Sequence, residues 1–307
     1  MRIAVTGAAG AIGRVVVAEL RSRGHEVVAI DRSAPGAADP GTGGQVGIAS
    51  PLRAYLAEPL TEGVEWHVGD ARDEALLTTA MAGCEALIHL AAIPAPTLGT
   101  PVEVFTTNTG ATFTALEVAG RAGVRAVAIA SSISLLGLPY APTPISPLYA
   151  PVDEQHPNIG SDPYALSKEV DEATAAMMHR RFGYQSIALR ISGTAPMAFH
   201  LDRLPAAEAD TSLLSHELWA YLDTRDGARA FILAVERDIP GFHVINVMAP
   251  DTNSTTPTAE LMARHHPTTP LRRPLVGRES VFDVTKARDL LGWSAEHRLF
   301  PESDGGG

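Results

Sequence analysis

The feature that most constrains the fold is a glycine-rich turn near the start of the chain. A short apolar run, Ile3 to Val5, leads into the segment TGAAGAIG at residues 6–13, and residues with helical character follow it. In such a unit Gly7 takes the sharp turn, Gly10 lets backbone amides approach a pyrophosphate, and Gly13 lets the helix pack closely on the strand. The segment therefore predicts a dinucleotide-binding unit within a parallel sheet.

An acidic residue stands where this unit requires one. The second apolar run, Glu26 to Ile30, ends in Asp31, 18 residues after Gly13 and close to the spacing of about 20 expected for the carboxylate that binds the adenosine ribose. A carboxylate there favours NAD. Arg32, directly after it, could meet a 2′-phosphate instead, so NADP stays open as the less favoured cofactor.

The rest of the chain continues the alternation of strands and helices. Apolar runs that indicate strands cover residues 64–68, 86–90, 124–130 and 186–191, and helix candidates cover 73–81, 102–120 and 162–182. This order predicts an α/β fold, a doubly wound parallel (Rossmann) sheet of about seven strands with a small C-terminal substrate-binding lobe. Residues 1–193 form the NAD-binding domain and 194–307 the lobe, with 225–248 returning to the core sheet.

Two segments are expected to lie outside this pattern. Residues 33–59 are rich in Gly, Pro and Ala and indicate a long surface connection, with a short helix at 52–57. Residues 301–307 are expected to form a loose tail.

Several small or polar residues follow the predicted strands. Ligands of open parallel sheets bind beyond the carboxyl ends of the strands, so Ser131 and Ser132 can reach a substrate there. Asp70 either lies near adenine or caps the next helix. For Ser134 we prefer a role in stopping the strand, and His89 is expected to be packed and hydrogen-bonded.

A tyrosine and a lysine stand four residues apart, Tyr164 and Lys168, at the start of a predicted helix. Pro163 suits the first helical position, and Ser161 or Asp162 can cap it. Residues at this spacing share a helix face, so the ammonium can favour the ionised phenol and make it a usable acid and base. The pair alone is a weak signal and gains meaning only beside a cofactor.

The composition of the chain excludes some classes of binding partner. The chain has 307 residues and a formal charge of −11, and no basic run is longer than the pair Arg272-Arg273, so neither nucleic acid nor a membrane surface is the expected partner. A single cysteine, Cys84, cannot form an internal disulfide and fits the cytoplasm. We find no cluster with metal-ligand spacing and expect no metal site.

Taken together, these motifs resemble the extended short-chain dehydrogenase/reductases of the NAD-dependent epimerase/dehydratase family, over most of the chain. The matching pieces are the glycine turn, Gly69-Asp70, HLAA at 89–92, Asn108, Ser131-Ser132 with Gly137, Tyr164-x-x-x-Lys168, and a late segment from Val284 to Trp293.

The resemblance implies roles for these residues. Tyr164 would be the general acid/base, Lys168 would hold the ribose hydroxyls and lower the tyrosine pKa, and Ser132 would hydrogen-bond the reacting oxygen. It also implies a homodimer packed through the helices at 102–120 and 162–182. The expected cofactor contacts are Gly7, Gly10, Ala11, Ile12, Gly13, Asp31, Arg32, Asp70, Ala71, Leu90, Ala91, Ala92, Asn108, Tyr164, Lys168 and Ile191.

Departures from the family pattern bear on the reaction. Family members that eliminate water carry an acidic residue directly after the catalytic hydroxyl position, whereas Ile133 follows Ser132, so a dehydratase is not expected. The lobe is also short for a nucleotide, and its layout is similar to that of uronate-type sugar dehydrogenases. The expected substrate contacts are Ser132, Ser134, Arg190, Ser192, Trp219 and Arg278. Arg190 or Arg278 could hold a carboxylate or phosphate, and a surface or packing role is the preferred alternative for each.

Three functions are consistent with these motifs. The first is a dehydrogenase of a free sugar, sugar acid or related carbinol, and the second is a nucleotide-sugar epimerase that recycles tightly bound NAD. The third, a non-catalytic NAD-binding sensor, is disfavoured because Ser132, Tyr164 and Lys168 are all present.

Overall fold

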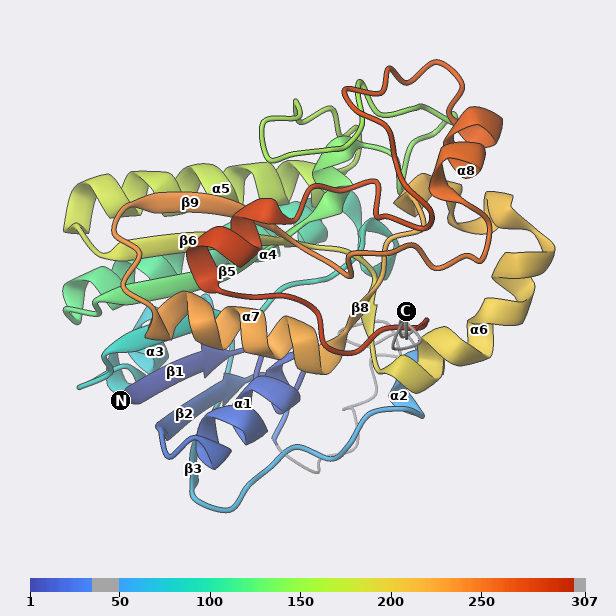
Figure 1. Ribbon diagram of the computed structural model, residues 1–307. Helices are drawn as coiled ribbons and strands as arrows, with labels where there is room; N and C mark the ends of the chain where they lie inside the picture. Colours follow the sequence, from blue (N-terminus) through green and yellow to red (C-terminus); the bar gives the residue numbers. More distant parts are fainter. Residues whose placement is uncertain (35–49, 301–307) are drawn as a thin grey trace.

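The protein is built on one parallel sheet. A computed structural model describes residues 1–34 and 50–300 and contains a seven-stranded sheet of order β3-β2-β1-β4-β5-β6-β9, in which every pair is parallel (Figure 1). The predicted doubly wound α/β fold is confirmed. The strands are β1 (Arg2–Thr6), β2 (Glu26–Asp31), β3 (Val64–Val68), β4 (Ala86–His89), β5 (Ala126–Ser132), β6 (Gln185–Ile191) and β9 (Phe242–Val247).

Helices cover both faces of this sheet. Helices α1 (Gly13–Ser22) and α7 (Thr224–Glu236) lie on one face, and α3 (Glu74–Ala80), α4 (Pro101–Arg121) and α5 (Pro163–Phe182) on the other (Figure 1). Because successive side chains of a strand point to opposite faces, Ile3 and Val5 pack with α1 and α7 whereas Ala4 packs with α3 and α4. Burial on both faces explains why the strands read as continuous apolar runs.

The order of the strands fixes where a ligand can bind. The chain passes from β1 to β2 and β3 on one side and then crosses to β4 on the other side of β1. Crevices of α/β sheets open where the strand order reverses in this way, beyond the carboxyl ends of the strands. The ends of β1 and β4 therefore define the expected cofactor site.

Side-chain caps define several helix starts. Asp162 caps α5, with one carboxylate oxygen accepting from the amides of Tyr164 and Ala165, so of the two expected candidates it is Asp162 that acts. Asp73, and not Asp70, caps α3. Asp223 caps α7.

The predicted boundaries of the fifth strand and of the short second helix differ most from the structure. The fifth strand continues past Ala130, because Ser131 and Ser132 still pair with Arg190 and Ile191 of β6. The short helix expected at 52–57 is instead α2 (Ser50–Arg53), with Pro51 in its first turn, a position that proline favours. The remaining parts of the surface connection, 35–49, and the tail, 301–307, lie outside the described residues.

A lobe lies beyond the carboxyl ends of the strands. It contains β7 (Thr194–Ala195), α6 (Met197–Ala209), β8 (Leu222–Asp223) and α8 (Thr258–His265), while α7 and β9 return to the main sheet (Figure 1). Its core includes Trp219, Met262 and Phe282, and also Ile133 and Val152 from the first half of the chain. The boundary at residue 193 stays a prediction.

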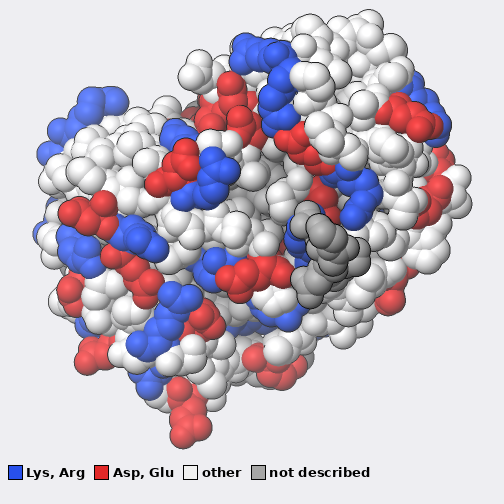
Figure 2. Space-filling view, in the orientation of Figure 1, with Lys and Arg blue, Asp and Glu red and all other residues white. Residues whose placement is uncertain are grey.

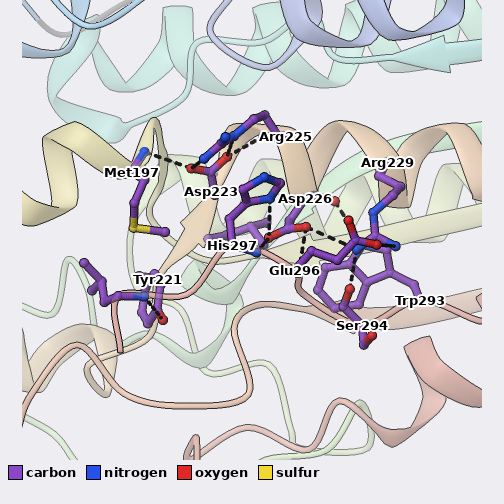
Figure 3. A network of polar contacts seen from close by, with 12 residues as sticks. Met197, Tyr221, Asp223, Arg225, Asp226, Arg229, Trp293, Ser294, Glu296 and His297 are labelled. Carbon is purple, nitrogen blue, oxygen red and sulfur yellow. Dashed lines mark hydrogen bonds and ion pairs between the residues drawn. The ribbon is translucent and has the colours of Figure 1, made fainter. Parts of the chain in front are cut away.

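The end of the described chain is fastened to α7. The Asp226 carboxylate is fully buried, accepts hydrogen bonds from the amides of Glu296 and His297 at 3.0 and 2.7 Å, and pairs with Arg229 (Figure 3). The indole of Trp293 donates to the Asp226 carbonyl at 2.9 Å. These bonds hold the late Val284–Trp293 segment against the core. The segment contains the short helix η4 (Ala287–Leu291), whose Ala287 and Leu291 are part of that core.

The surface carries charges of both signs. On the face shown in Figure 2, Lys and Arg side chains alternate with Asp and Glu and form no continuous basic stripe. Across residues 1–34 and 50–300, no helix combines the length and apolar character needed to cross a membrane.

Candidate active site

A cleft of about 500 Å³ opens at the predicted edge of the sheet. Its floor is the glycine turn, and its walls come from the ends of β2, β4, β5 and β6 and from the start of α5. The predicted site residues that line it are Gly7, Gly10, Ala11, Ile12, Gly13, Asp31, Arg32, Asp70, Ala71, Leu90, Ala91, Ala92, Ser132, Ser134, Tyr164, Lys168, Ile191 and Ser192.

The glycine turn is shaped so that only glycine fits at two positions. Gly7 has φ +68°, and a Cβ on it would lie 2.7 Å from the Ala91 amide nitrogen. A Cβ on Gly13 would lie 2.1 Å from the Gly7 carbonyl oxygen. No side chain caps the start of α1, although the amides of Arg14 and Val15 already donate to the carbonyls of Gly10 and Ile12. The positive end of the helix still faces the cleft, where an anion would be favoured.

Asp31 closes the opposite side of this turn. Its carboxylate oxygens accept from the amides of Ala9 and Ser33, each at 3.0 Å, which fixes the side chain at the end of β2. Asp70 is held by two hydrogen bonds from the Arg72 guanidinium at 2.7 and 2.9 Å, and these bonds lower the pKa of its carboxyl. Asp31 is thus oriented by backbone groups alone, and its remaining lone pairs can meet ligand hydroxyls.

Tyr164 and Lys168 share one face of α5 and both line the cleft. Tyr164 is 8% exposed, and the Lys168 ammonium lies 5.8 Å from the centre of its ring. Lys168 donates to the Ala130 carbonyl at 2.9 Å and pairs with the buried Asp171 at 3.1 Å. Burial disfavours the ammonium, but Asp171, Tyr164 and Glu172 together outweigh this effect, so the pKa of Lys168 lies above its ordinary value. The lysine is therefore a fixed positive charge beside the phenol.

Ser132 and Ser134 form a small hydroxyl group at the end of β5. The Ser132 hydroxyl donates to that of Ser134 at 3.0 Å and accepts from the Ser134 amide at 3.1 Å, which caps the turn Ile133–Leu136. The predicted strand-stopping role of Ser134 therefore belongs to Ser132. Both side chains line the cleft.

Asn108 lies behind the cleft and does not line it. Its amide group bonds the backbone of Ile93 at 2.7 and 3.1 Å and donates to the Ser167 hydroxyl at 3.0 Å. Among the expected cofactor-binding residues, Asn108 was the neighbour in the helix behind the dinucleotide, and it lies in that helix, α4, without lining the cleft. Asn108 ties α5 to the segment after β4, because its side chain is used up by these partners.

Three expected substrate contacts also lie outside the cleft. Both oxygens of the buried Glu172 hold the Arg190 guanidinium at 2.8 Å. Arg278 lies in a separate surface pocket, 3.6 Å from Asp251. Trp219 is 1% exposed and donates to the Thr211 carbonyl at 2.8 Å within the core of the lobe. The expected substrate contact is therefore corrected for Trp219, while Arg190 and Arg278 have the packing and surface roles that were the alternative for each.

Several residues that line the cleft had not been expected from the sequence, among them Arg14, Thr107, Tyr140 and Glu217. Arg14 donates to the carbonyls of Ala9 and Gly10 and lines the cofactor end. Thr107, Tyr140 and Glu217 also line the cleft. Arg14 follows the glycine turn directly and could have been found there. Tyr140 lies in a turn and Glu217 ends the short 3-10 helix η3 (Thr211–Glu217), and neither segment has a periodic sequence signal.

His89 is buried under the cleft. Its two ring nitrogens lie 2.8 Å from the Thr6 hydroxyl and 3.2 Å from the Thr112 hydroxyl, as expected for a packed and hydrogen-bonded residue. Desolvation lowers the pKa of His89 from 6.5 to about 3. The folded protein therefore keeps this ring neutral throughout the mildly acidic range.

This burial predicts a loss of stability in acid. The unfolded chain binds the His89 proton near pH 6.5 and the folded chain only near pH 3, so the unfolded state gains protons as the pH falls. The free energy of unfolding should decrease by about 1.4 kcal/mol per pH unit across that window from this residue alone. Urea titrations of wild type and His89→Gln measure it: the variant should show the shallower slope, and equal slopes would contradict the assignment.

The cleft has no cluster of metal ligands. Within the described ranges, no group of three or more His, Cys, Asp or Glu side chains is arranged to hold a metal ion.

Comparison with known proteins decides the family. The model of the NAD dependent epimerase/dehydratase family matches residues 3–195. The chain belongs to this family. It is therefore an NAD-dependent enzyme of the extended short-chain dehydrogenase/reductase type.

Individual relatives agree with this membership. A UDP-glucose 4-epimerase of Lacticaseibacillus casei is 27% identical over 203 residues, 64% of this chain but only 53% of that protein. Another, from Rhizobium leguminosarum bv. trifolii, is 24% identical over 97% of this chain and 93% of its own length. An L-arabinose 1-dehydrogenase (NAD(P)(+)) of Haloferax volcanii is 29% identical over 62% of this chain and 66% of its length.

A solved structure shows the same fold. A short-chain dehydrogenase/reductase superfamily protein from Agrobacterium tumefaciens with bound NAD has a TM-score of 0.68 and is 24% identical, covering 97% of this chain and 93% of that one.

The shape of the cleft itself also fits NAD. The close approach at Gly7 and Gly13 leaves a cradle that a Cβ would fill, and the uncapped start of α1 suits the pyrophosphate. Asp31 and Arg32 line the same end of the cleft.

Proposed function

We propose that the protein transfers hydride between NAD and a secondary alcohol or ketone of a sugar-like substrate. The observation that carries this proposal is that Tyr164, Lys168 and Ser132 line the same cleft as the glycine turn. A proton-transfer group thus shares one cavity with the cofactor cradle, as alcohol oxidation requires.

Each residue has a role in the reaction. Bound NAD supplies the hydride acceptor. The Ser132 hydroxyl holds the reacting oxygen, and the ionised Tyr164 phenolate takes its proton as the carbonyl forms. Lys168 is charged and buried, so it stabilises the phenolate without taking part in bond changes. In the reverse direction Tyr164 returns the proton to the alkoxide.

A dehydrogenase that acts on a free sugar is the first form of this proposal. The arabinose dehydrogenase among the relatives supports it. The nucleotide-sugar epimerase stands second, because several relatives carry the name UDP-glucose 4-epimerase. The two differ in one respect: the dehydrogenase releases NADH with each turnover, whereas the epimerase returns the hydride to its substrate.

The test is a substrate scan of purified protein with added NAD. We expect NADH absorbance to rise in proportion to a consumed free sugar, with no isomer of UDP-glucose or UDP-galactose formed. Interconversion of these two nucleotide sugars without net NADH would replace the dehydrogenase by the epimerase. Sugar turnover with a Tyr164→Phe variant at the wild-type rate would remove the catalytic assignment.

We also propose that two chains pair through α4 and α5 in the cytoplasm. Apolar side chains stand exposed on these two helices: Val102 at 71%, Phe113 at 48% and Leu166 at 48%. Covering them would remove apolar surface from water. The single buried thiol, Cys84, suits a reducing compartment.

Phe113→Glu tests the pairing. A charge placed within an apolar interface should convert a dimer into monomers in sedimentation velocity. Val276→Glu is the matched control, because Val276 is also exposed, at 74%, but lies on the lobe, and it should leave the mass unchanged. A monomeric wild-type protein at micromolar concentration would contradict the proposal.

A further inference from the structure

We propose that Glu217 makes the enzyme selective for uncharged sugars, by accepting hydrogen bonds from substrate hydroxyls and repelling substrates that carry a carboxylate or phosphate. The inference rests on the proposed function, since it names the substrate class of that site. It replaces the sugar acid as a candidate substrate.

Glu217 reaches the cleft from the lobe. It lines the cavity together with Ser192, Gly193 and Thr194, the residues that follow β6. Its Oε2 atom would lie only 3.2 Å from a Cβ on Gly193, so the carboxyl packs against the backbone there. The Glu217 side chain is 33% exposed. A carboxyl in this position faces the space that a substrate must enter.

The backbone beside Glu217 is held in an unfavourable conformation. Leu218 and Trp219 have φ values of 54° and 55°, in the left-handed region that residues other than glycine rarely adopt. Buried partners hold them there: the Trp219 indole donates to the Thr211 carbonyl at 2.8 Å, and the Trp219 carbonyl accepts from the Asn253 amide at 2.8 Å. The lobe therefore fixes the position of Glu217 at a cost in backbone strain, as is usual of functional positions.

Tyr140 lies on the catalytic side of Glu217. Its ring meets that of Tyr164 edge to face, with 6.4 Å between centroids. Burial, with smaller contributions from Tyr164 and Glu217, raises the pKa of Tyr140, so its phenol stays protonated and can donate a hydrogen bond. Glu217 and Tyr140 thus offer an acceptor and a donor, which suits the hydroxyls of a sugar.

The distribution of charges around the cleft also favours an uncharged substrate. Its lining cations among the described residues are Arg14, Arg32, Arg53 and Lys168, which come from the cofactor side or belong to the catalytic pair. Arg190 and Arg278, the expected anion anchors, are bound elsewhere. The segments 132–140 and 191–217 contribute no Lys or Arg to the lining. An anionic substrate group at this end would meet Glu217 and no paired cation.

Groups near Glu217 do not cancel its effect. His216 lies 3.8 Å away but is 44% exposed and does not line the cleft, and Arg203 on α6 attracts the carboxylate only at longer range. Burial raises the pKa of Glu217. Assays at alkaline pH therefore give the charged form.

The test compares matched neutral and acidic sugars. Each pair, galactose with galacturonate and glucose with glucuronate, is assayed for NADH formation and titrated calorimetrically into the NAD complex of Tyr164→Phe, which binds without turnover. We expect the neutral member of at least one pair to exceed its acid by about tenfold or more in kcat/KM and in affinity, because like charges brought together in a cleft are strongly disfavoured. Glu217→Gln, which keeps the shape and removes the charge, should narrow that gap about tenfold.

Controls separate this inference from the proposed function. Glu260→Gln, an exposed carboxylate of α8 paired with Arg264, should leave the ratio unchanged. Formation of NADH with any sugar supports the proposed function whatever the preference. Equal or tighter binding of the uronates by the NAD complex would overturn the selectivity, and so would a gap that Glu217→Gln leaves intact. The wild-type ratio decides the matter even if that variant fails to fold.

Discussion

Replacing Tyr164 with phenylalanine is expected to lower kcat of sugar oxidation about a thousandfold while NAD still binds. The variant removes only the hydroxyl, and a positioned acid/base group contributes a factor of about 10² to 10⁴. The ring, its contact with Tyr140 and the start of α5 remain, because none of them depends on the hydroxyl. Steady-state kinetics with NAD fluorescence titrations measure both quantities.

Tyr149→Phe is the matched control for this prediction. Tyr149 is also buried, and its hydroxyl donates to Asp153 at 2.6 Å, away from the cleft lining. Its loss should cost about 1 kcal/mol of stability and leave kcat within a factor of about two. Equal losses of kcat in both variants would mean that the hydroxyl of Tyr164 acts through structure and not through proton transfer.

Gly13→Ala is expected to abolish measurable NAD binding and to destabilise the fold by about 3 kcal/mol. The added Cβ would meet the Gly7 carbonyl at 2.1 Å, so either α1 or the turn must move. Alanine is the better helix former by about 1 kcal/mol, but that gain is smaller than the cost of the clash. Thermal denaturation and calorimetric titration with NAD measure the two effects.

Gly110→Ala shows what the same substitution does without a clash. Gly110 lies inside α4, and its added Cβ would be 3.5 Å from the Arg72 side chain, an ordinary contact. We expect unchanged NAD affinity and stability equal to or up to about 1 kcal/mol above wild type. If Gly13→Ala behaved like Gly110→Ala, the cradle would not be set by the glycine turn.

Local signals made the fold and the cofactor end predictable. The turn around Gly7 and Gly13, the position of Asp31 and the burial of the strands on both faces are each fixed within a few neighbouring residues. The start of α5 was equally local, since Asp162 and Pro163 define it. These parts of the structure agree with the sequence because close neighbours decide them.

The substrate end depends on contacts between distant parts of the chain. Arg190 looked available for an anion, but Glu172 binds it from another element, and Asn108 is used up by Ile93 and Ser167. Glu217 gave no signal, because its place in the cleft follows from two strained residues and the burial of Trp219. Side-chain pairs between distant elements and strained backbone conformations cannot be predicted from the spacing of residues in the sequence.

Transfer of deuterium to the cofactor tests the central claim most directly. Sugars deuterated at the carbinol carbon, L-arabinose and galactose first, are incubated with the purified protein and NAD, and the cofactor is examined by mass spectrometry. Direct hydride transfer assisted by Tyr164 predicts one deuterium in each NADH formed, and none with Tyr164→Phe over the same time. Oxidised sugar accompanied by unlabelled NADH, or label retained in an isomerised sugar with no NADH, would contradict the account.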